Sequence, residues 1–373
     1  MAQPEVTTVR GTCAPEFGLV REEFERNFAE RGEVGAAVTV MVAGETVVDL
    51  WGGIADTATQ RRWEQDTTVV VWSCTKGATA LCAHMLADRG ELDVDAPVGR
   101  YWPEFASAGK EEITVRMLLS HQAGLPAVRR ELPAGAFYDW ELMTGALAAE
   151  SPFWTPGMQH GYHGLTFDFH IGLPEADEAR VARVIPQVPD PQNLSPMEQA
   201  AFTDPTSIPY LMLVNSGGYM LPGEADTRTA HAAELPSTGG ITNARGLAAM
   251  YRPLAEGGTP LVSEGTVRRM AAVASAATDA VILLPTRWTQ GFVKAIDNRR
   301  FGPGQSVIYA EEAFGHPGIG GSAGFADPRA RMSFGYVMNK HGNGAGLNDR
   351  GQSLIDAAYR SLHYQTDAYG SWA

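Results

Sequence analysis

Within residues 69–90 of the sequence, a serine stands three positions before a lysine, where an apolar run gives way to a helical pattern. Side chains at i and i+3 share one face of a helix, so the Lys76 amine would fold back toward the Ser73 hydroxyl. A desolvated lysine loses its proton more easily and could then take the serine proton. The pair therefore predicts a serine nucleophile with a lysine beside it.

The position of Ser73 at a predicted helix start supports this interpretation. A helix N-terminus presents free N–H groups and the positive end of the macrodipole, which favour the negative charge of a tetrahedral intermediate. The alternative is that Ser73 only caps the helix while Lys76 is solvated. Cys74 and Cys82 are expected to be buried or idle thiols, because no His or Arg stands at a spacing that would acidify them.

The composition excludes several other classes of protein. The chain has 373 residues, 44% of them hydrophobic and 19% charged, which indicates one large globular domain or two lobes. A net charge of −14 disfavours nucleic acid and anionic membranes as partners. An odd count of three cysteines argues against a disulfide framework. Without a secretory leader pattern or a long apolar window, we expect a cytoplasmic protein with no membrane span.

The pattern of elements predicts an α+β fold. Strand-like segments lie near both ends of the chain, and helices lie between them. We therefore expect an antiparallel sheet built from N- and C-terminal segments and flanked by helices, plus a mostly helical lobe. Residues 1–75 and 240–373 would form the lobe with the sheet, and residues 76–239 the helical and loop lobe, with the active site between them.

Individual elements follow from periodicity and from turn residues. Helices are expected at 17–31, 75–89, 114–120, 139–149, 243–256, 265–277 and 347–363. Strands are expected on either side of a hairpin turn at 43–45, and at 290–296, 306–310, 321–327 and 332–339.

Five segments in order resemble the serine β-lactamase-like and penicillin-binding-protein superfamily. They are SCTKG around Ser73, LLSHQAGLP (118–126), GYHGLTF (161–167), GGITNARGLAAMY (239–251) and GHPGIGGSAGFADP (315–328). The likeness is greatest to the class C β-lactamase-related esterases, known as family VIII carboxylesterases. It runs over nearly the whole chain and implies the fold and chemistry of that group.

By this resemblance, Tyr162 is the general base that activates the serine and later the acid. A neighbouring lysine cation would lower the pKa of the phenol enough for this role. The backbone N–H groups of Ser73 and Ile319 would form the oxyanion hole. Gly164 replaces the asparagine that holds a substrate amide in some relatives, which weakens the case for lactam binding.

The third motif of true β-lactamases, Lys-Thr-Gly, corresponds here to His316-Pro317-Gly318. Its lysine anchors a substrate carboxylate, so its loss favours esters, while His316 could donate a hydrogen bond or assist proton transfer. We expect His316 and Gly318 to contact substrate. Apolar walls of the substrate site are expected from Trp72, Phe153, Trp154, Tyr138 and Trp140, although each aromatic residue could equally belong to the core.

Two competing motifs are less consistent with the sequence. Residues 320–324 satisfy Gly-x-Ser-x-Gly, but that nucleophile elbow needs a helix directly after Ser322, and strands are expected there. His160 and His163 form His-x-x-His without a further ligand cluster, so no metal site is predicted, and His160 is expected to face solvent or the pocket. At Phe167–Asp168 the chain departs from its relatives, in which a helical stretch intervenes between these segments.

We therefore predict a serine hydrolase that cleaves carboxylic esters through an acyl-enzyme on Ser73. It needs no metal and no cofactor, and its partner is a small-molecule ester. An acyltransferase of the same fold, a β-lactamase or peptidase, and a catalytically silent binding protein are the alternatives. The sequence leaves open the physiological ester and the oligomeric state, for which a homodimer is one option.

Overall fold

The computed structural model describes residues 8–164, 172–187, 191 and 194–373. Its main sheet is antiparallel, with strand order β1-β3-β2-β11-β10-β9, and β4 pairs with β3. The strands of this sheet are β1 (Arg10–Cys13), β2 (Gly35–Val42), β3 (Glu45–Asp56), β4 (Arg61–Arg62), β9 (Phe314–Pro317), β10 (Ala323–Asp327) and β11 (Met332–Met338).

Neighbouring strands β2 and β11 join the two ends of the chain in the middle of the sheet. Val38 of β2 pairs with Tyr336 of β11, and both are fully buried. The hairpin between β2 and β3 turns at Ala43 and Gly44, whose φ angles of 50° and 83° are both left-handed, as a tight two-residue hairpin requires. The predicted α+β fold is confirmed, as is this hairpin.

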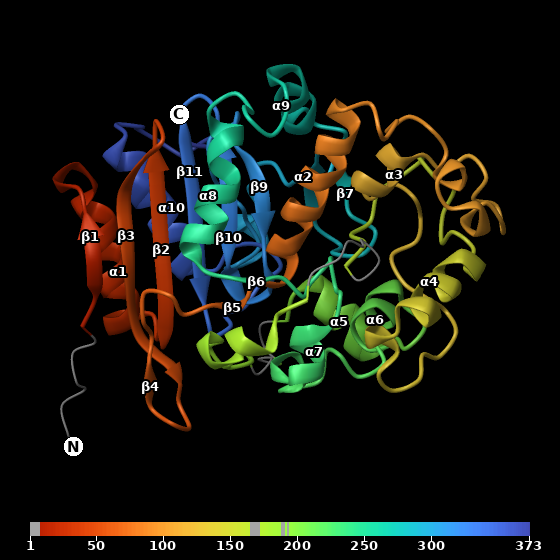
Figure 1. The fold of residues 1–373 in the computed structure, drawn as a ribbon, viewed down its shortest axis with the longest axis horizontal. Coiled ribbons are helices and arrows are strands. Elements are labelled where there is room, and N and C mark those ends of the chain that lie inside the picture. Colours follow the sequence, from red (N-terminus) through yellow and green to blue (C-terminus); the bar gives the residue numbers. More distant parts are fainter. Residues whose placement is uncertain (1–7, 165–171, 188–190, 192–193) are drawn as a thin grey trace.

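Helices cover both faces of the sheet (Figure 1). On one face, α1 (Gly18–Glu30) packs beside α10 (Asp349–Ser361), and both bury apolar side chains in the same core. On the other face, α8 (Ala244–Ala255) lies directly on β10 and β11. Gly335 permits this contact, because a Cβ there would lie 2.2 Å from the carbonyl oxygen of Ala244.

Most of the remaining helices lie beyond the edge strand β9 in Figure 1. The helices are α2 (Thr75–Asp88), α3 (Val115–Leu119), α4 (Trp140–Ala149), α5 (Pro196–Thr203), α6 (Ile208–Leu213), α7 (Arg228–Ala232) and α9 (Glu264–Ala271). Two small ribbons pair β5 (Val69–Val70) with β6 (Ile241–Thr242) and β7 (Ser275–Thr278) with β8 (Pro285–Trp288). The exact division into two lobes stays a prediction.

Three expected elements differ from the observed ones. The helix predicted for 265–277 ends at Ala271, and Ser275 already begins a strand. The runs at 290–296 and 306–310 form no strands and meet only at the single bridge Ile296–Val307. Their apolar side chains are buried in the core, so burial rather than strand pairing accounts for the pattern that suggested strands.

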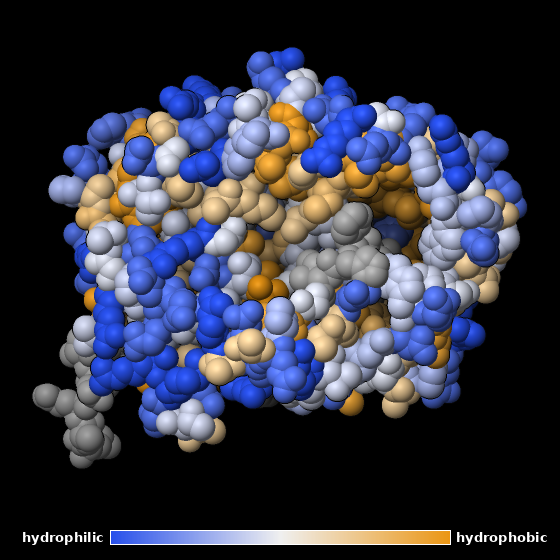
Figure 2. Space-filling view, in the orientation of Figure 1, coloured by the Kyte–Doolittle hydropathy of each residue, from blue (hydrophilic) through white to orange (hydrophobic). Residues whose placement is uncertain are grey.

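On the outside, hydrophilic residues cover most of the face shown in Figure 2, and hydrophobic residues gather around a hollow on its right-hand side. Among the residues with described structure, no helix is both long enough and apolar enough to span a bilayer. All three cysteines are free thiols.

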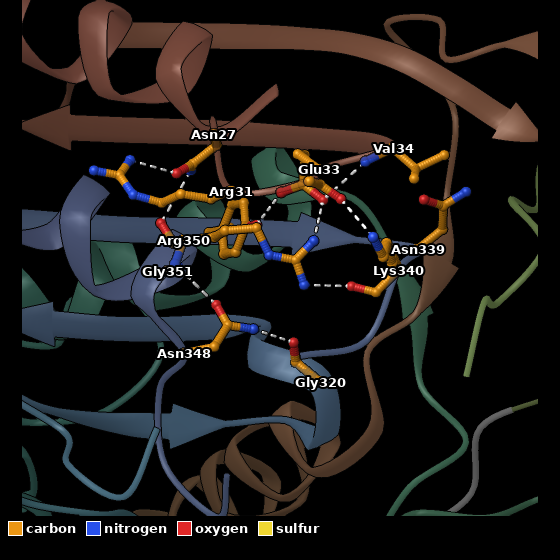
Figure 3. Close-up of polar contacts among 12 residues, drawn as sticks. Asn27, Arg31, Glu33, Val34, Gly320, Asn339, Lys340, Asn348, Arg350 and Gly351 are labelled. Atoms are coloured by element: carbon orange, nitrogen blue, oxygen red, sulfur yellow. Dashed lines mark hydrogen bonds and ion pairs between the residues drawn. The ribbon is translucent and has the colours of Figure 1, made fainter. Parts of the chain in front are cut away.

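A buried ion pair connects the start of β2 with the start of α10 (Figure 3). Arg350 Nη1 donates to Glu33 Oε1 at 2.8 Å, with side-chain exposures of 6% and 0%. The hydroxyl of Tyr336 donates to the other carboxylate oxygen. Burial raises the pKa of Glu33, and the Arg350 guanidinium opposes this rise.

Removing one member of this pair should strongly destabilise the protein. Glu33→Ala leaves the Arg350 charge buried without its carboxylate, and we expect the free energy of unfolding to fall by about 3–5 kcal/mol. Urea unfolding followed by tryptophan fluorescence measures this change. In the exposed pair Arg268–Glu264, where both side chains are about 70% exposed, Arg268→Ala should hardly move the urea midpoint. Equal shifts in the two variants would contradict the prediction.

Candidate active site

Ser73 lies in a single 3-10 turn, Trp72–Cys74, between the end of β5 and the start of α2. The turn is tethered by Val71 N, which donates to Gly240 O at 2.8 Å. Trp72 has a left-handed φ of 50°, which is rare for so bulky a residue. Its ring packs against His341, with ring centres 5.4 Å apart. The side chain of Ser73 does not cap α2, so the interpretation of Ser73 as a plain N-cap is wrong.

The structure brings together the three side chains that were predicted to be catalytic. Lys76 Nζ lies 3.4 Å from Ser73 Oγ, and the Tyr162 hydroxyl donates a hydrogen bond to the same oxygen. Lys76 is fully buried and also donates to the carbonyl oxygens of Gly164 and Ser237, each at 2.8 Å. If Lys76 were an amine, its two hydrogens could stay on these carbonyls while its lone pair faced Ser73.

The electrostatics of Tyr162 differ from the expectation. Burial raises the pKa of its phenol above the ordinary value, and the hydrogen bond to Ser73 offsets this only in part. The prediction that the lysine cation lowers this pKa is therefore wrong. In the resting site Tyr162 is a neutral phenol that can give a proton.

Sequence reasoning missed Asp279, whose carboxylate binds the backbone N–H of Tyr162. Its fully buried carboxylate accepts hydrogen bonds from the backbone N–H groups of Tyr162 at 3.0 Å and of Val281 and Ile282 at 2.9 Å. It also accepts one from Trp288 Nε1 at 3.1 Å, and the Trp288 ring stacks on the Tyr162 ring at 5.5 Å. A weak signal was available, since Asp279 is the only charged residue between Arg269 and Arg287.

His316 lies at the edge of the site as a neutral acceptor. Its Nδ1 contacts Pro317 O at 2.7 Å, and because a carbonyl can only accept, the proton must be on Nδ1. Burial and the nearby Lys76 charge lower its pKa to about 3. Its Nε2 therefore carries a lone pair, and this buried atom accepts no hydrogen bond from a described group. The Nδ1–H of His316 thus donates to Pro317 O, and a hydrogen bond from His316 to substrate stays a prediction.

The two amides predicted to form the oxyanion hole come from segments that touch each other. A Cβ on Gly318 would lie 2.3 Å from Val71 O, so the Gly318–Gly321 turn packs directly on the segment that carries Ser73. Between described residues, neither the Ser73 nor the Ile319 backbone N–H donates a hydrogen bond to another backbone group. Both amides therefore remain candidates for binding a substrate oxygen.

Ser73 opens into a cavity of about 530 Å³, which Trp72, Tyr162, His316, Gly318 and Ile319 also line. Its walls are mainly apolar, with contributions from Met197, Met212, Met220, Ile282, Val293 and Ile296. An ester with apolar substituents would suit such a surface.

Four aromatic residues expected in this wall lie elsewhere, and one of them, Trp140, is exposed at the first position of α4. Phe153 packs under the guanidinium of Arg129, 3.6 Å from the ring centre, and Trp154 packs edge-on against His163 at 6.1 Å. The hydroxyl of Tyr138 donates to a Glu224 carboxylate oxygen at 2.6 Å. The other three pack around the core of the helical part and do not line the described cavity, because an aromatic side chain suits a core as well as a pocket.

The competing motifs have structural roles. Ser322 is fully buried and leads into β10 rather than a helix, as expected. His160 is buried too, contrary to expectation, and its ring nitrogens contact the hydroxyls of Ser275 and Thr286. The Nε2 atom of His163 accepts a hydrogen bond from Leu125 N at 3.0 Å, and its Nδ1 donates to Gly161 O at 2.7 Å. Within the described ranges, no group of three His, Cys, Asp or Glu side chains could hold a metal ion.

Comparison with known proteins defines the family. The sequence profile of the Beta-lactamase family matches residues 21–169 and 165–359. Esterase/beta-lactamase LipL of Mycobacterium tuberculosis is 32% identical over 380 residues, which cover 89% of this chain and 83% of LipL. The chain therefore belongs to the Beta-lactamase family. The two profile matches overlap at residues 165–169, which contain the Phe167–Asp168 junction and lie outside the described residues.

Two solved structures are similar over almost the full length. A family VIII carboxylesterase is 35% identical with a TM-score of 0.81, and the match covers 95% of this chain and 100% of that one. A penicillin-binding protein homologue from Caulobacter crescentus is 34% identical with a TM-score of 0.79, and the coverage is the same. The resemblance noted in the sequence is thus confirmed.

The protonation states of the buried histidines predict the shape of the pH profile. Burial lowers the pKa of His163 to about 4, and that of His316 is about 3, so both rings stay neutral as the pH falls from 8 to 5. We expect His316→Gln to reduce ester turnover without moving any inflection of kcat/KM in this range. Initial rates across this pH range test this, and an inflection near pH 6–7 that disappears in the variant would contradict it.

Proposed function

We propose that the chain is a serine ester hydrolase that cleaves small-molecule carboxylic esters through an acyl-enzyme on Ser73. The observation that carries the proposal is that Lys76 Nζ and the Tyr162 hydroxyl both contact Ser73 Oγ at the wall of an apolar cavity. A silent binding protein would have no need for a buried amine and a phenol on one serine oxygen.

In the proposed acylation step, Ser73 Oγ attacks the ester carbonyl carbon, and the serine proton passes to Lys76 in its amine form. The carbonyl oxygen becomes an oxyanion that the Ser73 and Ile319 amides bind. Tyr162 gives its proton to the leaving alkoxide as the C–O bond breaks, and it regains a proton from the Lys76 ammonium. Water then attacks the acyl-enzyme by the reverse sequence of proton transfers and releases the acid.

The charges around the cavity favour neutral esters over substrates that carry a carboxylate. Glu198 and Asp226 are acidic groups in its wall, and the described wall contains no Lys or Arg. By the resemblance, His316 replaces the lysine that anchors a substrate carboxylate in true β-lactamases, and burial and the nearby Lys76 charge lower its pKa to about 3, so the ring is neutral. An anionic substrate would therefore meet repulsion instead of an anchor.

Nucleophile replacement tests the proposal directly. Ser73→Ala should lower the turnover of p-nitrophenyl acetate and butyrate by at least about 10³-fold. Ser322→Ala should retain most of the activity, because Ser322 has no part in the proposed catalytic site. Intact mass after brief exposure to the acetate should show one acetyl adduct, mapped to the peptide with Ser73. Retained turnover in Ser73→Ala would refute the assignment, and transfer of the acyl group to an added alcohol would indicate an acyltransferase.

Substrate charge gives a second test. For matched aryl esters that differ only in a distal methyl ester or free carboxylate on the acyl group, kcat/KM should be at least about tenfold higher for the neutral compound at low salt. Nitrocefin, which carries a carboxylate, should be hydrolysed much more slowly than p-nitrophenyl butyrate. Comparable rates for nitrocefin would favour a β-lactamase.

A further inference from the structure

We propose that Asn348 is a positioning residue for the oxyanion hole, which it orients through the carbonyl group of Gly320. The inference rests on the proposed function, because it assigns the Ile319 N–H to the substrate oxygen. Asn348 itself lies at the N-terminus of α10 and would not touch the ester.

The segment Gly318–Gly321 is a tight turn with Ile319 at its second position. Gly321 N donates to Gly318 O at 3.0 Å, and Gly320 has φ 85° and ψ −10°, which are the features of a type II turn. In such a turn the N–H of the second residue takes no part in the closing hydrogen bond. The direction of the Ile319 N–H thus depends on how the following peptide groups are held.

Two donors fix the carbonyl oxygen of Gly320. Gly342 N donates to it at 3.0 Å, and Asn348 Nδ2 donates to it from the N-terminus of α10. The fit leaves no spare room, because a Cβ on Gly320 would lie 2.4 Å from the His341 ring and one on Gly321 would lie 2.1 Å from Asn348 Nδ2. The turn is therefore positioned by contacts rather than by its own sequence alone.

Asn348 is itself held in one orientation (Figure 3). Its Oδ1 accepts hydrogen bonds from the backbone N–H groups of Arg350 and Gly351, each at 3.1 Å, and so caps α10. With Oδ1 on two donors, Nδ2 must face Gly320 O. The side-chain amide of Asn348 thus links the N-terminus of α10 to the turn through hydrogen bonds.

Arg350 connects both donors of Gly320 to the buried ion pair. Its Nη2 donates to Lys340 O at 2.6 Å, two residues before Gly342, while its Nη1 binds Glu33. Figure 3 shows this guanidinium between the Glu33 carboxylate and Lys340. The same segment carries His341, whose ring packs on Trp72 beside Ser73. One network therefore supports both amides of the oxyanion hole.

A matched pair of substitutions isolates the hydrogen bond to Gly320. Asn348→Asp keeps an oxygen to cap α10 but replaces the Nδ2 donor by an acceptor, which repels Gly320 O. Asn243→Asp is the control, since Asn243 caps α8 through Oδ1 to Gly246 N at 3.0 Å and does not contact the turn. Aspartate and asparagine cap helices about equally well, so the two variants should have similar thermal midpoints.

The expected result is a loss in the chemical step with little change in binding of the ground state. For p-nitrophenyl butyrate, Asn348→Asp should reduce kcat by about tenfold to a hundredfold, with KM changed by less than about threefold. The inhibition constant of an alkyl boronic acid, which forms a tetrahedral adduct on Ser73, should rise by a similar factor. Asn243→Asp should retain the parent values.

Equal kcat and boronic acid inhibition in the two folded variants would overturn the proposal. If Asn348→Asp does not fold, Asn348→Ser decides in its place, because serine also caps helices but is too short to reach Gly320 O. These outcomes are separate from a failure of the proposed function. In that case Ser73→Ala would stay active and no acyl adduct would form on Ser73, whatever the Asn348 variants do.

Discussion

The burial of Lys76 is the constraint on which the site depends. A fully buried lysine nitrogen needs oxygen acceptors close by, and the chain supplies the carbonyls of Gly164 and Ser237 from segments far apart in sequence. Both segments must therefore converge on the first turn of α2. The first of them also contains Tyr162, so satisfying the lysine places the phenol on Ser73. The contacts that pack these segments around Lys76 therefore also bring Tyr162 to Ser73.

The sheet supplies the other half of the arrangement. Pairing of β2 with β11 brings the N-terminal Glu33 close to the C-terminal Arg350, and their ion pair lies just beyond the ends of these strands. From there, contacts run through α10 to the turn that presents Ile319. The Ser73 segment thus contacts both the Lys76 environment and the sheet side, through Trp72 on His341 and Val71 on Gly318. An active site between two such supports needs both to be formed before it can react.

Local spacing and recurring segments made much of this predictable. The Ser73–Lys76 pair follows from helix geometry, and the hairpin and most helices follow from periodicity. Tyr162 and Ile319 could be named only by resemblance, because their partners lie about 90 and 250 residues away along the chain. The reversed pKa shift of Tyr162 arises from burial, which no local pattern reports.

Other residues could not be predicted because their roles depend entirely on tertiary contacts. Asp279 and Asn348 look like ordinary polar residues until the structure shows which N–H and C=O groups they bind. Phe153 and Trp154 were misplaced for the opposite reason, since bulky apolar side chains carry no mark that separates a core from a cavity wall. Sequence therefore indicated the candidate reacting groups better than the groups that hold them in place.

The acidic wall of the cavity has a consequence for the end of each cycle. Ester cleavage converts an uncharged compound into an alcohol and a carboxylic acid, which ionises near neutral pH. In the proposed reaction this anion would form in a cavity whose wall includes Glu198 and Asp226 and, among its described residues, no Lys or Arg. Repulsion from this acidic wall would then favour release of the acid, so the proposed hydrolysis would promote the departure of its own product.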